Sequence, residues 1–281
     1  MTTLNAYASL AEYKAFVTAR AGTTTVGADD DSVVEQLLKA ASRLIDDSTD
    51  RHFYPIIQTR YFDVPKANDL DPRMIKMDDD LLEVITLVNG DGTTIPSTEY
   101  TLKPRNDSPH FGIRLVDNST YIWASDGAGD LHDVIAVTGI WGFHNRYNLA
   151  WSLGSTLNEA LDDNETAIDV TSGTLFAVGN IIKVENEFGY VSAVVTNTLT
   201  STRGANGSTA SSHLTALNVY IWQHMEDLKL AVLETAMRAY KRRFGQSSGG
   251  TETITGAGVV ITPADIPAFA REFIKTHRRY L

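Results

Sequence analysis

Hydrophobic side chains repeat at helical spacing in four segments of the chain. Between Val34 and Ile45, for example, apolar residues recur every three or four positions and would share one face of a helix. Ser9 followed by Glu12 is the pattern of a capping box, which marks a helix start directly after it. This spacing predicts helices over residues 10–21, 33–47, 221–244 and 266–277. The apolar face of the second helix should consist of Val33, Val34, Leu37, Leu38, Ala41, Leu44 and Ile45.

Between residues 51 and 137 the pattern changes to short apolar stretches separated by turn residues, which is typical of β-strands. The sequence Asn89-Gly90-Asp91-Gly92 predicts a tight turn, because these residues tolerate positive φ angles. Two aspartate triplets have simple interpretations: residues 29–31 as the charged start of a helix, and residues 78–80 as a solvated turn before a strand. We expect strands over residues 57–64, 81–88, 100–102, 113–116 and 134–138.

Residues 152–220 differ in composition, being rich in Thr, Asn, Val and Gly and poor in Lys and Arg. Strands are predicted over 166–170, 181–184, 190–195 and 198–202, with tight turns at 187–189 and 206–207. The sequence thus predicts an α+β fold. Residues 1–151 and 221–281 form a body of about four helices with a small β-sheet region. Residues 152–220 form an inserted all-β module, similar to a barrel or sandwich.

Charge is distributed unevenly along the chain of 281 residues, whose net charge is −11. Residues 221–281 carry nine Lys/Arg against six Asp/Glu, whereas the rest is acidic. An acidic body does not wrap DNA, because duplex affinity comes largely from Lys and Arg on phosphates, but it is compatible with a pore through which DNA slides. The basic end suggests docking on an acidic partner, although a solvated helix end explains the charge equally well.

The sequence also restricts the compartment and the chemistry. Cysteine is absent, which excludes disulfides, thiolate metal sites and a cysteine nucleophile. No apolar run approaches the roughly 20 residues of a membrane-spanning helix, and the N-terminus lacks the pattern of a signal peptide. We therefore expect a soluble protein made in the cytoplasm, with no membrane partner.

Motifs that carry catalysis are missing from the sequence. Residues 245–250 are rich in Gly and Ser but lack the Lys-Ser/Thr of a phosphate-binding loop, and the seven histidines include no pair at metal-binding spacing. Aromatic residues such as those of segment 139–151 can stack on nucleic-acid bases. We prefer the interpretation that this segment contributes to the core or to a contact between subunits. We expect a structural protein and not an enzyme, with no cofactor or metal.

The order of these segments resembles the head–tail connector (adaptor, head-completion) proteins of tailed phages. The resemblance rests on Leu10-Ala-Glu-Tyr-Lys-Ala-Phe-Val, on the helix from Val33 that ends before Thr49-Asp-Arg-His-Phe, and on Ile135-Ala-Val-Thr-Gly-Ile-Trp-Gly-Phe. It continues in the long helix from Leu228 to Arg243 and in the closing segment Ile266-Pro to Arg278-Arg-Tyr. Residues 152–220 depart from the family pattern.

This resemblance implies a ring of about twelve subunits at the head–tail interface of the virion. The ring would bind the portal protein on one side and a stopper, tail-terminator or tail protein on the other, and genomic DNA would pass through its lumen. It also implies that the C-terminal segment docks on the portal, through Arg271, Lys275, Arg278, Arg279, Tyr280 and Leu281. Two alternatives stay open: another neck or tail-completion protein, and a carbohydrate-binding or polysaccharide-acting virion protein that uses Tyr190, Trp222 and nearby acids.

Overall fold

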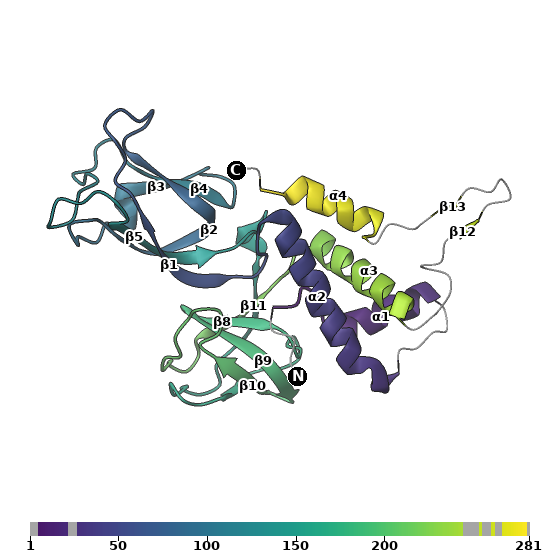
Figure 1. Cartoon of the computed structure of the whole chain (residues 1–281). Coiled ribbons are helices and arrows are strands. Elements are labelled where there is room, and N and C mark those ends of the chain that lie inside the picture. Colours follow the sequence, from purple (N-terminus) through teal and green to yellow (C-terminus); the bar gives the residue numbers. More distant parts are fainter. Residues whose placement is uncertain (1–4, 22–26, 244–252, 255–259, 262–265, 280–281) are drawn as a thin grey trace.

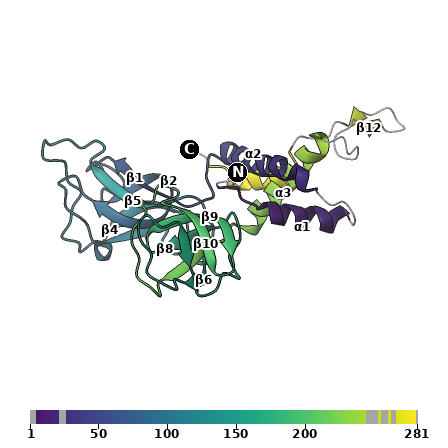
Figure 2. The same ribbon diagram turned by 90° about the horizontal axis from the view of Figure 1, so that it is seen from below.

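The computed structural model describes residues 5–21, 27–243, 253–254, 260–261 and 266–279. Its described part contains four α-helices and two antiparallel sheets of five and six strands, so the predicted α+β fold is confirmed. The helices lie together at one end of the molecule, the five-stranded sheet lies at the other, and the six-stranded sheet lies beside both (Figure 1). The view from below shows the same three groups (Figure 2).

Each predicted helix is present, and the starts of the first two follow from local chemistry. Ser9 and Glu12 form the predicted capping box: the Ser9 N–H donates to the Glu12 carboxylate over 2.7 Å, and the Glu12 N–H donates to Ser9 Oγ over 3.2 Å. The aspartates at 29–31 stand at a helix start, as predicted, in the short 3₁₀ turn Ala28–Asp30 and the first turn of α2. The helices are α1 (Leu10–Ala21), α2 (Asp31–Thr49), α3 (Glu226–Arg243) and α4 (Ala268–His277).

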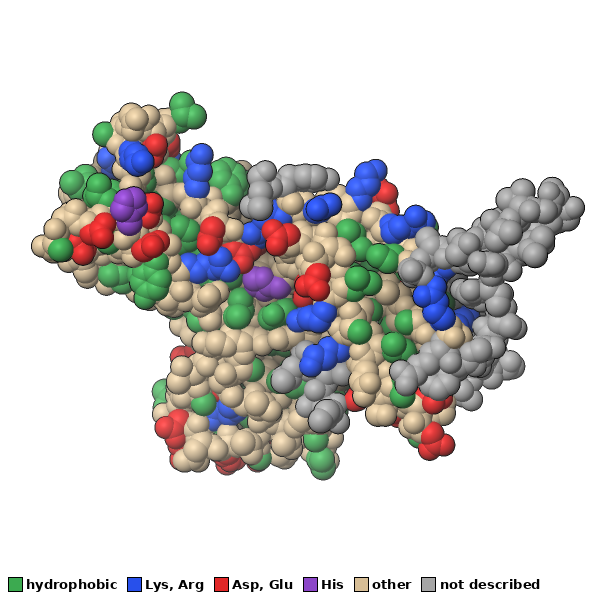
Figure 3. All heavy atoms as spheres, viewed as in Figure 1, with side chains coloured by type: hydrophobic (Ala, Val, Ile, Leu, Met, Phe, Trp, Pro, Cys, Tyr) green, Lys and Arg blue, Asp and Glu red, His purple; other side chains and the backbone are tan. Residues whose placement is uncertain are grey.

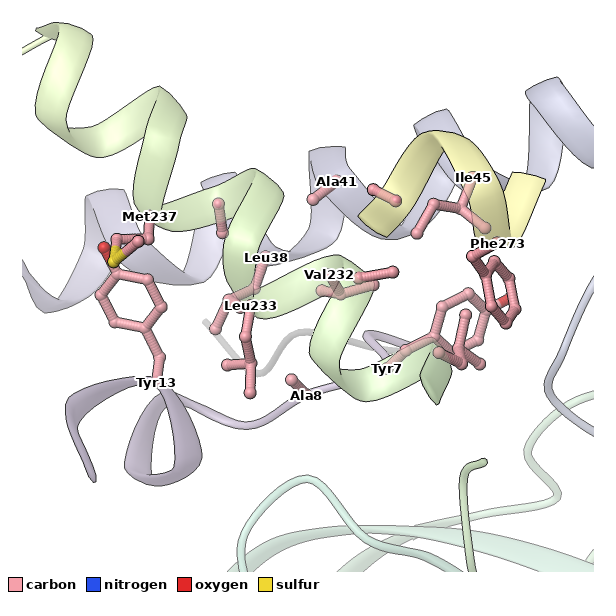
Figure 4. Close-up of a cluster of buried hydrophobic side chains, with 14 of the residues drawn as sticks. Tyr7, Ala8, Tyr13, Leu38, Ala41, Ile45, Val232, Leu233, Met237 and Phe273 are labelled. Carbon is pink, nitrogen blue, oxygen red and sulfur yellow. The ribbon is translucent and has the colours of Figure 1, made fainter. Parts of the chain in front are cut away.

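The helical core joins the two ends of the sequence. The apolar face of α2 packs against α3 and α4, and residues from the segment before α1 close the cluster (Figure 4). One member of the predicted face is wrong: Leu44 is 38% exposed, whereas Leu38 is fully buried. Leu44 lies at the edge of the apolar face, so it is the first position that neighbouring helices fail to cover. The members that are at most 1% exposed are Tyr7, Tyr13, Val34, Leu38, Ile45, Phe53, Leu228, Ala231, Val232, Ala236 and Ala270.

The five-stranded sheet has the order β1-β5-β2-β4-β3 and its own core of Ile, Leu, Val and Trp side chains. Residues 89–92 form the predicted turn, since the Gly92 N–H donates to the Asn89 oxygen over 2.9 Å. A short 3₁₀ turn, Ser97–Glu99, leads into β3. The strands are β1 (Ile56–Phe62), β2 (Met74–Val88), β3 (Tyr100–Lys103), β4 (His110–Leu115) and β5 (Ile135–Trp141).

The six-stranded sheet has the order β6-β11-β8-β9-β10-β7. It spans residues 151–222, so its first strand along the chain starts one residue before, and its last strand ends two residues after, the expected module limits of 152 and 220. A 3₁₀ turn, Tyr147–Leu149, precedes it. The strands are β6 (Trp151–Thr156), β7 (Ala167–Asp169), β8 (Ile181–Val184), β9 (Glu187–Val195), β10 (Thr198–Arg203) and β11 (Asn218–Trp222). A short pair, β12 (Thr253–Ile254) and β13 (Val260–Ile261), follows α3 in the chain.

Two local predictions for this region are wrong. The helix expected from Ile221 starts only at Glu226, because the β-branched and aromatic run before it forms β11, whose Val219 and Ile221 enter the sheet core. Residues 187–189 do not form a turn but begin β9, where Phe188 is fully buried. In both cases tertiary burial overrides the local pattern.

The six-stranded sheet packs firmly against the rest of the protein. A shared buried cluster combines Leu82 and Ile140 of the five-stranded sheet with Phe188 and Trp222. The predicted Asn206-Gly207 turn lies against β1, where the Asn206 oxygen accepts a hydrogen bond from the Ile57 N–H over 2.9 Å. Gly207 has φ +79°, and a Cβ there would lie 2.1 Å from the Ile57 oxygen, so this contact requires glycine.

The helical core yields a first testable prediction. Replacing Leu38 by Ala should lower the free energy of unfolding by about 2–5 kcal/mol, because it leaves a cavity between α2 and α3. Leu44→Ala on the same helix is the matched control and should change it by about 0.5 kcal/mol or less. Urea unfolding followed by circular dichroism measures both. Equal effects of the two substitutions would contradict the packing described here.

Candidate functional site

The predicted docking residues at the C-terminus do not form one group in the structure. Arg279 is turned toward the protein, with a side chain only 16% exposed. Residues 280–281, also predicted to dock, lie outside the described part of the chain. The remaining three have exposed side chains along α4 or directly after it, namely Arg271, Lys275 and Arg278.

Arg279 fastens the segment after α4 to the five-stranded sheet. Its guanidinium donates hydrogen bonds to the Asp79 carboxylate and, over 2.7 Å, to the backbone oxygen of Asp78. The Asp80 carboxylate lies 3.1 Å from the same group. The Arg279 backbone N–H also donates to the Thr49 oxygen at the end of α2, over 2.8 Å. This arginine is therefore an internal anchor, and the three exposed basic residues before it are the ones available to a partner.

Two further arginines complete this charged cluster around β2. Arg51 donates to both carboxylate oxygens of Asp80, over 2.9 and 3.0 Å. Arg60 contacts Asp79 over 2.5 Å and Asp78 over 3.0 Å. With the C-terminal arginine, three guanidinium groups face three carboxylates. Such charge-assisted hydrogen bonds are shorter and stronger than those between neutral groups, so they fix geometry as well as neutralising charge.

The prediction that residues 78–80 form a solvated turn is therefore wrong. They lie inside β2, and the side chains of Asp79 and Asp80 are only 12% and 11% exposed. Burial acts to raise the pKa of Asp79, but the Arg279 hydrogen bond and the nearby His52 lower that pKa overall. Burial prevails at Asp80 and raises its pKa. Buried carboxylates need partners, and these partners come from distant parts of the chain, which a local pattern does not reveal.

The aromatic segment 139–151 contributes to the core, as the sequence favoured. Trp141 is fully buried, and its indole N–H donates to the Gln58 oxygen over 2.9 Å. Phe143 packs against Phe53 with a distance of 5.6 Å between ring centroids. Base stacking needs an exposed ring face, which Trp141 does not offer.

A second candidate site is a cleft of about 600 Å³ between the start of α1 and the six-stranded sheet. Tyr190 and Trp222, the aromatic residues of the carbohydrate-binding alternative, line this cleft but are only 2% and 3% exposed. The acid Glu12 is already used in the α1 cap and in an ion pair of 3.3 Å with Lys229. At this cleft, therefore, neither Tyr190 nor Trp222 offers an exposed face on which a sugar ring could stack.

His224 also lines this cleft and is held in its neutral form. Burial, assisted by the positive charge of Lys229, lowers the pKa of His224 to about 3. Its ring packs edge-on against Tyr7, with the ring centroids 5.3 Å apart. The histidine is thus part of the junction between the helical core and β11.

A buried ion network in the six-stranded sheet was not found from sequence. The guanidinium of Arg203 contacts the Glu187 carboxylate over 2.6 Å, with both side chains 5% exposed. His213 lies between Glu187 and Glu185, with 2.8 Å from each ring nitrogen to a carboxylate oxygen. The Arg203 guanidinium also donates to backbone oxygens of surrounding loops, so the network ties these loops to β9 and β10. The only sequence signal was the unusual scarcity of Lys and Arg around Arg203.

Other chemistry is not supported within the described residues. They contain no group of three or more His, Cys, Asp or Glu placed to hold a metal ion. None of their helices combines the length and apolar character needed to cross a membrane. No protein-family model matches the chain, and no curated protein matches it either.

The anchoring role of Arg279 can be tested directly. Arg279→Ala should lower the free energy of unfolding by about 1–3 kcal/mol, because it leaves Asp79 and Asp80 partly buried with one partner fewer. The matched control is Arg278→Ala, its exposed neighbour, with an expected change of about 0.5 kcal/mol or less. Urea unfolding at neutral pH measures both. Indistinguishable stabilities would mean that the ion pairs do not hold this segment.

The neutral state of His224 predicts a dependence on pH. An unfolded histidine binds a proton below about pH 6.5, whereas the folded His224 does so only near pH 3, so acidification within this window destabilises the fold. His224→Gln should therefore lose less stability than the wild type between pH 7 and pH 4. A constant stability difference between the wild type and His224→Gln across this range would contradict the assignment.

Proposed function

We propose that the chain is a structural virion protein that forms a ring at the head–tail interface of a tailed phage. In this role it bridges the portal to the tail and lets DNA pass through its lumen. The observation that carries the proposal is the C-terminal helix, which projects Arg271, Lys275 and Arg278 from a helical body built by both chain ends. The order of elements agrees with the connector pattern that the sequence resembles.

The anchor at Arg279 supports a docking role for α4. A docking helix needs a fixed direction, and the ion pairs with Asp79 and Asp80 supply one at its C-terminal end. Phe273 is a second point of attachment, because its side chain is buried in the helical core. The exposed basic side chains then face outward from a rigid element, where arginine pairs well with the carboxylates of an acidic partner such as a portal surface.

Assembly into a ring needs a head-to-tail contact between neighbouring copies. Both sheets expose large apolar side chains that neighbours would cover, although single exposed apolar residues also occur on monomers. Exposed ones on the sheets and their loops include Phe111, Ile122, Leu153, Leu175 and Val195. The net charge of −11 suits a lumen on which DNA slides without adhering.

Native mass spectrometry of the purified chain tests ring formation. Twelve copies of a 30.8 kDa chain weigh about 370 kDa, and negative-stain images should show rings of that species. If the isolated chain needs the portal to assemble, adding purified portal protein should produce the ring. A chain that stays monomeric at high concentration, with and without portal, would overturn the proposal.

Docking by α4 is tested by replacing Arg271, Lys275 and Arg278 together with Ala in the virus. Phage heads should then lack tails, because each desolvated ion pair that loses a partner costs about 2–5 kcal/mol. Three exposed basic residues elsewhere, Lys39, Arg105 and Arg146, provide the control substitutions and should leave tails attached. Point substitutions are preferable to truncation after Lys275, which would also remove the Arg279 anchor. Normal tails on the α4 variant would contradict this docking role.

A further inference from the structure

A groove of about 970 Å³ lies on the five-stranded sheet, away from the helices. Its walls come from the loop after β1 and from residues 131–133 before β5, and its floor includes Phe62 and Ile75 of the sheet. Apart from Asp78, which belongs to the charged cluster, the residues that line it lie outside that cluster and outside the helical core. Docking on a partner through α4, as proposed above, does not involve this groove.

The groove carries more negative than positive charge. Two of its aspartates are already paired, Asp71 with Arg114 over 2.7 Å and Asp78 with Arg60 over 3.0 Å. Lys66 and Lys76 are the lysines in its lining, and the aspartates outnumber them. Figure 3 shows acidic side chains gathered together with hydrophobic ones over this end of the five-stranded sheet. The aspartates of the lining are Asp63, Asp69, Asp71, Asp78 and Asp133.

Apolar side chains stand exposed among these carboxylates. Leu70 is fully exposed, Tyr61 is 60% exposed and Leu131 is 47% exposed. Because folding of this chain does not bury these side chains, their apolar surface is accessible to a partner. An exposed apolar patch rimmed by polar side chains is typical of a protein-binding site.

The walls of the groove are held in place by hydrogen bonds. The Val64 N–H donates to the Leu131 oxygen over 2.8 Å, and the Asp133 N–H donates to the Asp63 carboxylate over 2.9 Å. Within the first loop, the Lys66 N–H donates to the Asp69 carboxylate over 2.9 Å. The groove is therefore formed before a partner arrives, which reduces the ordering cost of binding.

The charge and shape decide the class of occupant. Nucleic acid is repelled, because its phosphates carry the same sign as the groove. We propose that the groove docks a protein segment that carries Lys or Arg beside apolar side chains, contributed by the second partner of the ring. This inference rests on the proposed connector function. A connector needs two docking surfaces, and this chain offers a basic one on α4 for an acidic partner and an acidic one here for a basic partner.

The test uses the full chain and a short fluorescent peptide of alternating Lys and Leu, followed by fluorescence anisotropy. Two comparison peptides replace Lys by Glu or Leu by Ser, and both should bind at least about tenfold more weakly. Hydrogen exchange with the bound peptide should protect the loop after β1 and residues 131–133. The double variant Asp69→Asn and Asp133→Asn, and the single variant Leu70→Ser, should each weaken binding by about tenfold.

Matched controls lie on the six-stranded sheet. Asp162→Asn with Asp163→Asn removes two exposed charges there, and Leu214→Ser removes an exposed leucine, so neither should change peptide binding. Equal affinity for the Lys/Leu and Glu/Leu peptides, or groove variants that bind like the wild type, would overturn the proposal.

The mass of the ring is recorded in parallel, so that failure of the connector function can be distinguished from failure of the groove proposal. If the wild type forms no ring, with or without portal, the connector function fails whatever the peptide does. If rings form but the peptide ignores the groove, only the groove proposal fails. Loss of the ring in the groove variants, with the controls intact, would assign the groove to a second copy of this chain and overturn the proposed partner.

Discussion

The packing of α2 against α3 and α4 is the interaction on which the rest of the structure depends. Leu38 and Ile45 of α2 meet Val232 and Phe273 in one buried cluster, so the N-terminal and C-terminal parts of the chain close on each other. Everything between them must leave and return at this point, which places both sheets beside the helices. The hydrophobic burial in this cluster thus fixes the topology, and the exposed face of α4 is one of its consequences.

Two contacts of different kinds hold the other parts of the chain together. The first is apolar: Trp222 and Phe188 share a buried cluster with Ile140, so the six-stranded sheet packs on the five-stranded sheet. Replacing residues 152–220 by a linker would uncover that cluster. The second contact is electrostatic: Arg279 and the aspartates of β2 fasten the segment after α4 to the five-stranded sheet. The proposed docking helix is therefore positioned by its burial in the helical core and by the ion pairs after its C-terminal end.

The sequence predicted what is encoded by local repetition. The four helices, the α1 cap and the Asn206-Gly207 turn follow from side-chain spacing and from conformational preference, both of which act within a few residues. Features that depend on residues distant in the sequence were not predicted: the ion pair of the buried Asp80 with Arg51, and the network around Arg203. The candidate site was predicted only in part for the same reason. The exposure of Arg278 follows from its place at the end of a helix, whereas the burial of Arg279 depends on the aspartates of β2.

In the proposed function the chain is a bridge with two chemically opposite surfaces, a basic helix and an acidic groove. The most direct measurement is a cryo-electron microscopy reconstruction of the phage neck in which the chain is proposed to lie. We expect a ring of this fold between portal and tail, with α4 toward the portal and the groove facing the next protein. A neck in which this fold is absent, or a ring with α4 directed away from the portal, would contradict it.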